Sequence, residues 1–152
     1  SLVGSEMCIR DRVMYLGHTA PGQYVEMAET ARECVHAGFR ILKPGILVSD
    51  INKEIEGYLR KSRYGSQVVH SSGHSTGLNV TEYPNISDDC CETVRPGMVF
   101  ALENGVYPYD LEKGAGTIWI SFRMEDEALV TEQGAEWLSG PGKALYTLGD
   151  FC

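Results

Sequence analysis

The sequence predicts an α+β fold in which two helices are followed by a mostly antiparallel sheet. Apolar residues recur at helical spacing in residues 23–43 and again in residues 49–65. In residues 99–103 and 118–125, apolar and polar side chains instead alternate with a period of two, which is typical of half-buried strands. Two helices followed by such strands form an α+β arrangement.

The limits of the elements follow from local signals. A short strand is expected at residues 13–16, before a glycine-bounded loop and the first helix. That helix carries acids in its early turns and bases in its last turn, as the helix dipole favours, and Pro44 ends it. Ser49 or Asp50 is expected to cap the second helix. A third run of strand character covers residues 128–131.

The first 12 residues have a separate origin in this interpretation. They match the translation of a transposase-type sequencing adapter that ends in GAGATGTGTATAAGAGACAG. We therefore expect residues 1–12 to be an adapter-derived artefact and leave them out of the fold prediction. On this hypothesis, residues 13–152 are a partial domain whose upstream half is missing. The alternative is a genuine strand at the N-terminus.

The composition excludes several classes of partner. With 152 residues, 43% hydrophobic and 22% charged, the chain is typical of globular domains. Its net charge of −8, without a cluster of Lys and Arg, argues against nucleic acid. No apolar run approaches the roughly 18 residues of a membrane span, so no membrane partner is expected. Outside residues 1–12, the cysteines form no Cys-x-x-Cys motif, which predicts free thiols and a cytoplasmic location.

Three residues stand out as candidate metal ligands: His74 in a predicted loop, and Glu103 and Glu125 on the two predicted strands. One imidazole and two carboxylates suit Mn²⁺, Fe²⁺, Co²⁺ or Zn²⁺, any of which can activate a water molecule. Period-two geometry puts Glu103 on an apolar face, where an unpaired carboxylate is costly. The same geometry puts Arg123 beside Glu125, where a guanidinium can hold a metal-binding carboxylate.

Other polar residues are interpreted without a site. His18 and His36 are expected to be structural or solvated, and residues 88–92 are expected to form a solvated acidic loop. Tyr107 is favoured as a pocket wall because it closely follows Glu103.

Six phrases, taken together, carry a resemblance to a known family. They are Gly73-His74-x-x-Gly77-Leu78, Glu82-x-Pro84, Arg95-Pro-Gly-Met-Val-Phe100, Glu103-x-Gly105-x-Tyr107, Arg123-x-Glu125-Asp126 and Leu129-Val-Thr-Glu-x-Gly134. Their order and intervals over residues 13–139 resemble the C-terminal half of the pita-bread metallopeptidase superfamily. This superfamily includes methionine aminopeptidase, aminopeptidase P, prolidase and creatinase. The similarity is closest to the Xaa-Pro peptidase branch.

The resemblance implies a curved sheet and a centre of two divalent metal ions, drawn from Mn²⁺, Co²⁺, Fe²⁺ and Zn²⁺. It implies His74, Glu103 and Glu125 as ligands that converge on the concave face of the sheet, with a bridging water as nucleophile. His70 corresponds to a histidine that assists substrate binding or proton transfer, and Arg123 to a residue that orients the last carboxylate. The parent is then expected to be a homodimeric aminopeptidase or dipeptidase that cleaves an N-terminal peptide bond.

Two departures from the family pattern keep alternatives open. The family's two aspartate ligands lie upstream, and the second would fall near Ile9, so this fragment itself is expected to be inactive. Thr81 stands where peptidases carry a histidine, and threonine donates a hydrogen bond but is no acid near neutral pH. The alternatives are a creatinase-like hydrolase of another C–N bond and a binding module without catalysis.

Overall fold

The computed structural model describes residues 10–65, 68, 70–107, 121–140 and 142–151. The elements in chain order are β1 (Val13–Tyr15), α1 (Gly22–Ile41), α2 (Val48–Lys61), β2 (Gly73–Thr76), β3 (Glu82–Asn85), β4 (Val99–Val106), β5 (Phe122–Val130), β6 (Ala135–Trp137), β7 (Leu145–Thr147) and the 3₁₀ helix η2 (Leu148–Asp150). The predicted order, two helices and then an antiparallel sheet, is confirmed. Across the described ranges, no helix has both the length and the apolar character needed to cross a membrane.

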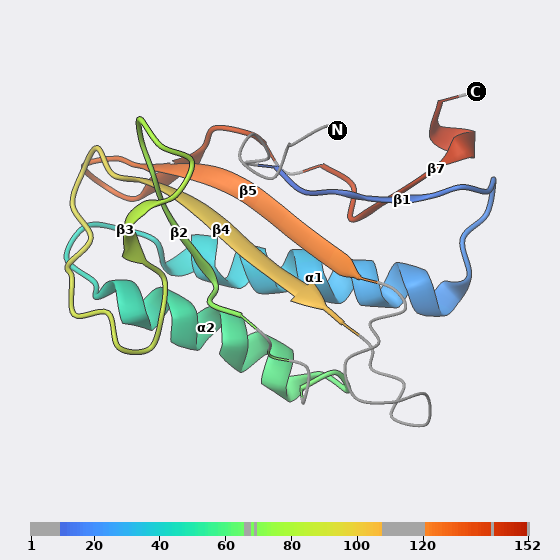
Figure 1. Cartoon of the computed structure of the whole chain (residues 1–152), viewed down its shortest axis with the longest axis horizontal. Helices are drawn as coiled ribbons and strands as arrows, with labels where there is room; N and C mark the ends of the chain where they lie inside the picture. The colour runs from blue at the N-terminus through green and yellow to red at the C-terminus, as the bar shows by residue number, and fades with distance from the viewer. Residues whose placement is uncertain (1–9, 66–67, 69, 108–120, 141, 152) are drawn as a thin grey trace.

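The sheet has five strands in the order β3-β2-β4-β5-β6, and all its pairings are antiparallel. Both helices cover one face of this sheet, and the long strands β4 and β5 lie across α1 (Figure 1). A separate parallel pair, β1 with β7, runs beside β5. The opposite face of β2, β4 and β5 is therefore left uncovered by helices.

The hydrophobic core lies between the sheet and the helices. Phe100 and Leu102 of β4 and Phe122 and Met124 of β5 are at most 1% exposed. They alternate along their strands with residues of the opposite face, as strand geometry requires. That opposite face is also buried at Ala101, so β4 is covered on both sides where half-burial was predicted.

The start of α2 differs from the predicted cap. Leu47 is the N-cap residue and no side chain caps the helix, while Ser49 and Asp50 lie in its first turn. Tertiary contacts order this end instead, because Leu47 pairs with Thr93 and the amide of Val48 donates to the carbonyl of Glu92. The strand-like entry fixes the direction of the helix, so a side-chain cap is not required.

The strand prediction was wrong in two places. The loop predicted around His74 is strand β2, which pairs with β4 despite its polar sequence. Residues 122–125 and 128–130 of the two predicted segments belong to a single strand, β5, and residues 118–120 lie outside the described part. Asp126 interrupts the apolar pattern, yet its carboxylate is paired within the fold and the strand continues through it.

The predicted free thiols are confirmed for Cys34, Cys90 and Cys91, whereas Cys152 falls outside the described residues. Burial raises the pKa of the Cys34 thiol to about 12.

We predict that Gly73→Ala destabilises the fold, because β2 passes β4 closely at this position. Gly73 has a φ of +129°, and an added Cβ would overlap the carbonyl oxygen of Ala101. The free energy of unfolding of the Gly73→Ala chain, measured in urea, should be lower than that of the unaltered chain by more than about 1 kcal/mol. The matched control is Gly57→Ala in α2, where nothing lies within 4 Å of the added Cβ. This control should gain roughly 0.5–1 kcal/mol, and equal effects of the two changes would contradict the prediction.

Candidate metal centre

The centre of the uncovered face is a pair of facing carboxylates. Glu103 of β4 lies directly opposite Glu125 of β5. Their amides point away from each other, since Glu103 N donates to Ser72 O at 3.0 Å and Glu125 N donates to Asp11 O at 3.3 Å. This is the pairing type without mutual hydrogen bonds, in which the two Cα atoms approach to about 4.5 Å and side chains lie closest.

Both carboxylates are withdrawn from water. Glu103 is 7% exposed and Glu125 is 1% exposed, and Oε2 of Glu125 has no hydrogen-bond partner. Burial, followed by repulsion from the carboxylates of Glu103 and Asp11, raises the pKa of Glu125 to about 8. A buried acid beside two others is costly to ionise, so this position favours either a proton or a nearby cation.

Arg123 pairs with Glu103 and not with Glu125, the carboxylate that the resemblance implies for it. Its guanidinium contacts the Glu103 carboxylate, and its Nε lies 2.8 Å from Asp11 Oδ2. Burial disfavours the charge of Arg123, but the carboxylates of Glu103 and Asp11 outweigh it and raise its pKa. Arg123 lies opposite Gly105, two residues after Glu103 on β4, and the ring of Tyr107 covers this glycine.

A histidine and a tyrosine extend this network. His70 Nε2 lies 2.6 Å from the hydroxyl of Tyr107, whose ring folds over Gly105. Burial raises the pKa of Tyr107 to about 12, with the carboxylates of Glu103 and Asp11 acting in the same direction against Arg123. The tyrosine therefore remains protonated near neutral pH and connects His70 to the Arg123 side of the pair.

His74 shares the face but is not drawn into a cluster. It lies opposite Ala101, two residues before Glu103 on β4, and its Nδ1 is 3.0 Å from the carbonyl oxygen of Ser75. In the part of the chain that the structure describes, no three His, Cys, Asp or Glu side chains are gathered so as to hold a metal ion. The expected convergence of all three ligands on one point is thus not seen, since Arg123 holds Glu103 and His74 is turned to the backbone.

Thr81 lies apart from these residues, exposed in the bend before β3. The described residues nevertheless fit a divalent cation in part. Hard oxygen donors suit such ions, and the Glu125 oxygen without a partner is the kind of buried acceptor that a cation would satisfy. The chain therefore supplies a carboxylate pair and a nearby imidazole, an incomplete set of ligands.

Sequence reasoning missed three residues near this site. Asp11 and Arg12 were left out with residues 1–12, yet Asp11 reaches Arg123 and Arg12 reaches Asp126. The role of Asp126 could have been found, because alternation along 122–128 puts this carboxylate among apolar side chains that face the helices. A buried carboxylate in such a position requires a cationic partner.

Comparison with known proteins gives the family. The pattern of metallopeptidase family M24 matches residues 10–132, so the chain belongs to this family. The Xaa-Pro dipeptidase of Lactobacillus helveticus is 32% identical over 120 residues, covering 79% of this chain and 30% of that protein. The Xaa-Pro dipeptidase of Pyrococcus furiosus is 31% identical over 120 residues, covering 79% of this chain and 32% of that protein. The chain spans about a third of the length of these curated relatives.

Solved structures confirm the pita-bread fold. The X-Pro aminopeptidase from Thermotoga maritima matches with a TM-score of 0.80 and 25% identity, covering 91% of this chain and 37% of that one. The N-terminal domain of the FACT complex subunit SPT16 from chickpea matches with a TM-score of 0.71 and 20% identity, covering 84% of this chain and 32% of that one. The second likeness concerns the fold alone.

We predict that Glu125 makes the stability of the metal-free chain depend on pH. Its pKa is raised from 4.5 to about 8 in the fold, so the protonated form stabilises the fold fully below pH 4.5. That contribution is lost as the pH rises through 8 and amounts to at most about 5 kcal/mol. Urea unfolding with a chelator at a series of pH values should show this decline.

Two variants separate the cause. Glu125→Gln should remove most of the decline between pH 4.5 and 8, because the titrating group is gone. Glu103→Gln should reduce it, because one source of repulsion is gone while burial remains. If the stability of the Glu125→Gln chain depends on pH in the same way as that of the unaltered chain, Glu125 is ionised throughout this pH range.

Proposed function

We propose that the full-length parent is a two-metal hydrolase of the Xaa-Pro type, an aminopeptidase or dipeptidase that cleaves an N-terminal peptide bond. Membership of metallopeptidase family M24 gives the class. The observation that carries the proposal is the buried Glu103–Glu125 pair, because two facing acids with one unsatisfied oxygen form an oxygen-rich half-site for divalent cations. The Xaa-Pro dipeptidases among the relatives support the finer substrate class.

The proposed roles follow the positions of the side chains. Glu103, Glu125 and His74 would hold the metal ions, and when bound these ions would polarise a carbonyl and lower the pKa of a water molecule. The raised pKa of Glu125 makes this pair suited to carry a proton. His70, through Tyr107, would assist binding or proton transfer at the edge of the site. Thr81 would contribute a hydrogen bond and no proton.

A pocket further along the same strands, next to Glu127, supports a small substrate. It has a volume of about 340 Å³ and lies where β2, β4 and β5 meet the turn after β2. Leu78, Val99 and Leu138 give it apolar walls, and Glu127 is its charged residue. An apolar wall with few polar groups is the usual form of a small-molecule site, which suits an uncharged ring such as that of proline.

We predict that the full-length parent releases the N-terminal residue from X-Pro peptides when Mn²⁺ or Co²⁺ is present. The physical reason is that the carboxylate pair can act only once its charge is balanced by cations. Glu125→Gln should reduce kcat/KM by at least about 100-fold, since a ligand and a proton carrier are lost together. Glu136→Gln, an exposed acid of β6, is the matched control and should change little. Liquid chromatography of the released residue gives the rates.

The outcome also separates the alternatives. Turnover of a small amidine, guanidine or modified amino acid, with no peptide cleaved, would assign the parent to the non-peptidase hydrolases of this fold. A binding module without catalysis is the other candidate. Such a module should copurify with less than stoichiometric metal. The inactivity of the present chain, a homodimeric parent, its cytoplasmic location and the adapter origin of residues 1–12 stay predictions.

A further inference from the structure

The segment that forms hydrogen bonds with the edge of β5 changes beside the candidate site. At Glu125, the strand donates to the carbonyl of Asp11 at 3.3 Å. Two residues further on, the amide of Glu127 donates to Ser139 Oγ at 2.9 Å, and its carbonyl accepts from Leu138 N at 2.9 Å. The carbonyl of Glu125 therefore lies at a junction between the N-terminal segment and the segment that follows β6.

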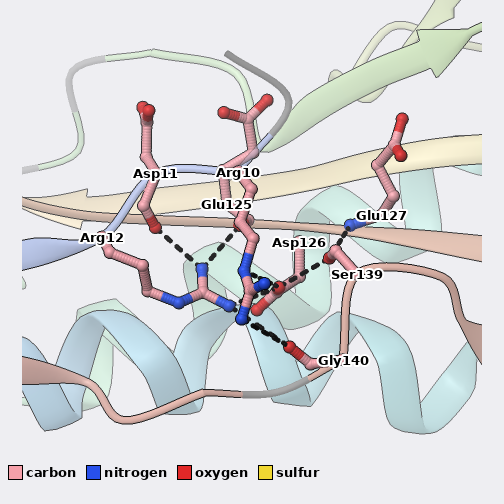
Figure 2. A network of polar contacts seen from close by, with 8 residues as sticks. All are labelled: Arg10, Asp11, Arg12, Glu125, Asp126, Glu127, Ser139 and Gly140. Carbon is pink, nitrogen blue, oxygen red and sulfur yellow. Dashed lines mark hydrogen bonds and ion pairs between the residues drawn. The ribbon is translucent and has the colours of Figure 1, made fainter.

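The guanidinium of Arg12 fills this junction. Its Nη1 donates to the carbonyl of Glu125 and to the carbonyl of Asp11, each at 2.8 Å. Figure 2 shows one nitrogen of the Arg12 guanidinium directed at both carbonyl oxygens. One side chain thus supplies the donors that a neighbouring strand would otherwise provide.

The same guanidinium neutralises a buried charge. Arg12 Nη2 lies 2.5 Å from Asp126 Oδ1, and the Asp126 side chain is fully buried. The hydroxyl of Ser139 donates to the same oxygen at 2.7 Å (Figure 2). Arg10 also approaches Asp126, but at 3.9 Å and from a side chain that is 44% exposed. Arg12, at 14% exposed, is therefore the main counter-charge of Asp126.

We propose that Arg12 is a positioning residue for Glu125. The guanidinium of Arg12 holds both residues of the Glu125–Asp126 peptide. It binds Glu125 at the backbone carbonyl and Asp126 at the side-chain carboxylate. Rotation of this peptide would swing the Glu125 side chain away from Glu103, so holding it fixes the distance between the two carboxylates. The inference rests on the proposed function, in which Glu103 and Glu125 bind metal. It also requires that Arg12 belongs to the protein and not to the adapter segment, which agrees with the family match beginning at residue 10.

The geometry requires arginine and not simply a positive charge. The contacts to Glu125, Asp11 and Asp126 use two nitrogens of one planar fork, which lysine cannot reproduce from a single point. Lysine could still neutralise Asp126. The Arg12→Lys chain therefore separates the two roles. It keeps the positive charge beside Asp126 but loses the paired hydrogen bonds to the backbone carbonyls of Glu125 and Asp11.

The experiment compares Arg12→Lys and Arg12→Met with Arg10→Met as the matched control. Amide hydrogen exchange on the metal-free chain measures how firmly the backbone at Glu125 is held. A Co²⁺ titration followed by visible absorption measures the metal affinity of the site. In both Arg12 chains the Glu125 amide should exchange at least about 10-fold faster while the amides of Phe100 and Leu102 keep their protection. Affinity for Co²⁺ should fall roughly 10- to 100-fold, as for residues that orient metal ligands. Arg10→Met should change neither.

The result that overturns the proposal is an Arg12→Lys chain, folded by circular dichroism, with unchanged exchange at Glu125 and unchanged Co²⁺ affinity. Arg12 would then act only as the counter-charge of Asp126. If Arg12→Met does not fold, Arg12→Lys decides alone. Failure of the proposed metal site is distinguishable, because Co²⁺ would then bind no more weakly to Glu125→Gln than to the unaltered chain. In that case the exchange rate of the Glu125 amide still tests whether Arg12 holds the backbone at Glu125.

Discussion

The register of β4 against β5, which sets Glu103 opposite Glu125, is the constraint on which the rest of this structure depends. A shift of one residue would move the acids to the helix-facing side and the phenylalanines to the open face. Burial of Phe100 and Phe122 against α1 excludes that shift, since both are at most 1% exposed. The hydrophobic core thus forces two carboxylates into the closest type of cross-strand pair, at a cost the protein must offset locally.

The offsets differ on the two faces of β5. On the helix-facing side, Asp126 Oδ1 is paired with Arg12 and accepts a hydrogen bond from Ser139, while Asp126 Oδ2 is buried without a partner. On the open side, Arg123 is shared between Glu103 and Asp11, and Glu125 keeps an oxygen without a partner. Both acids therefore keep one buried oxygen without a partner, and they differ in their counter-charge. A guanidinium is paired with the Asp126 carboxylate, whereas the nearby Arg123 is paired with Glu103 and Asp11 and not with Glu125.

The sequence was sufficient where one physical effect dominates. Both helices were predicted because their apolar faces repeat over many turns, and β4 because its alternation is regular. Strand β2 was missed because Gly73–Thr76 is short and polar, and its pairing with β4 comes from tertiary contact. The face shared by Glu103, Arg123 and Glu125 was predictable from the period of two. The acid with which Arg123 pairs was not predictable, since it depends on tertiary contacts with Glu103 and Asp11.

The N-terminal segment shows why local patterns cannot define the whole site. Asp11 and Arg12 have no periodic or motif signal of their own, yet they complete the edge of β5 through long-range contacts. The Arg12 guanidinium joins the N-terminal segment to β5 and, through Gly140 O at 3.4 Å, to the segment after β6. Residues more than 100 positions apart in the sequence therefore meet at Glu125. Carboxylates placed on adjacent strands need support from outside the strand pair, because the pair itself repels. Arg12 binds the backbone carbonyl of Glu125, and Arg123 binds the carboxylate of Glu103. Neither guanidinium contacts Oε2 of Glu125, which stays without a hydrogen-bond partner.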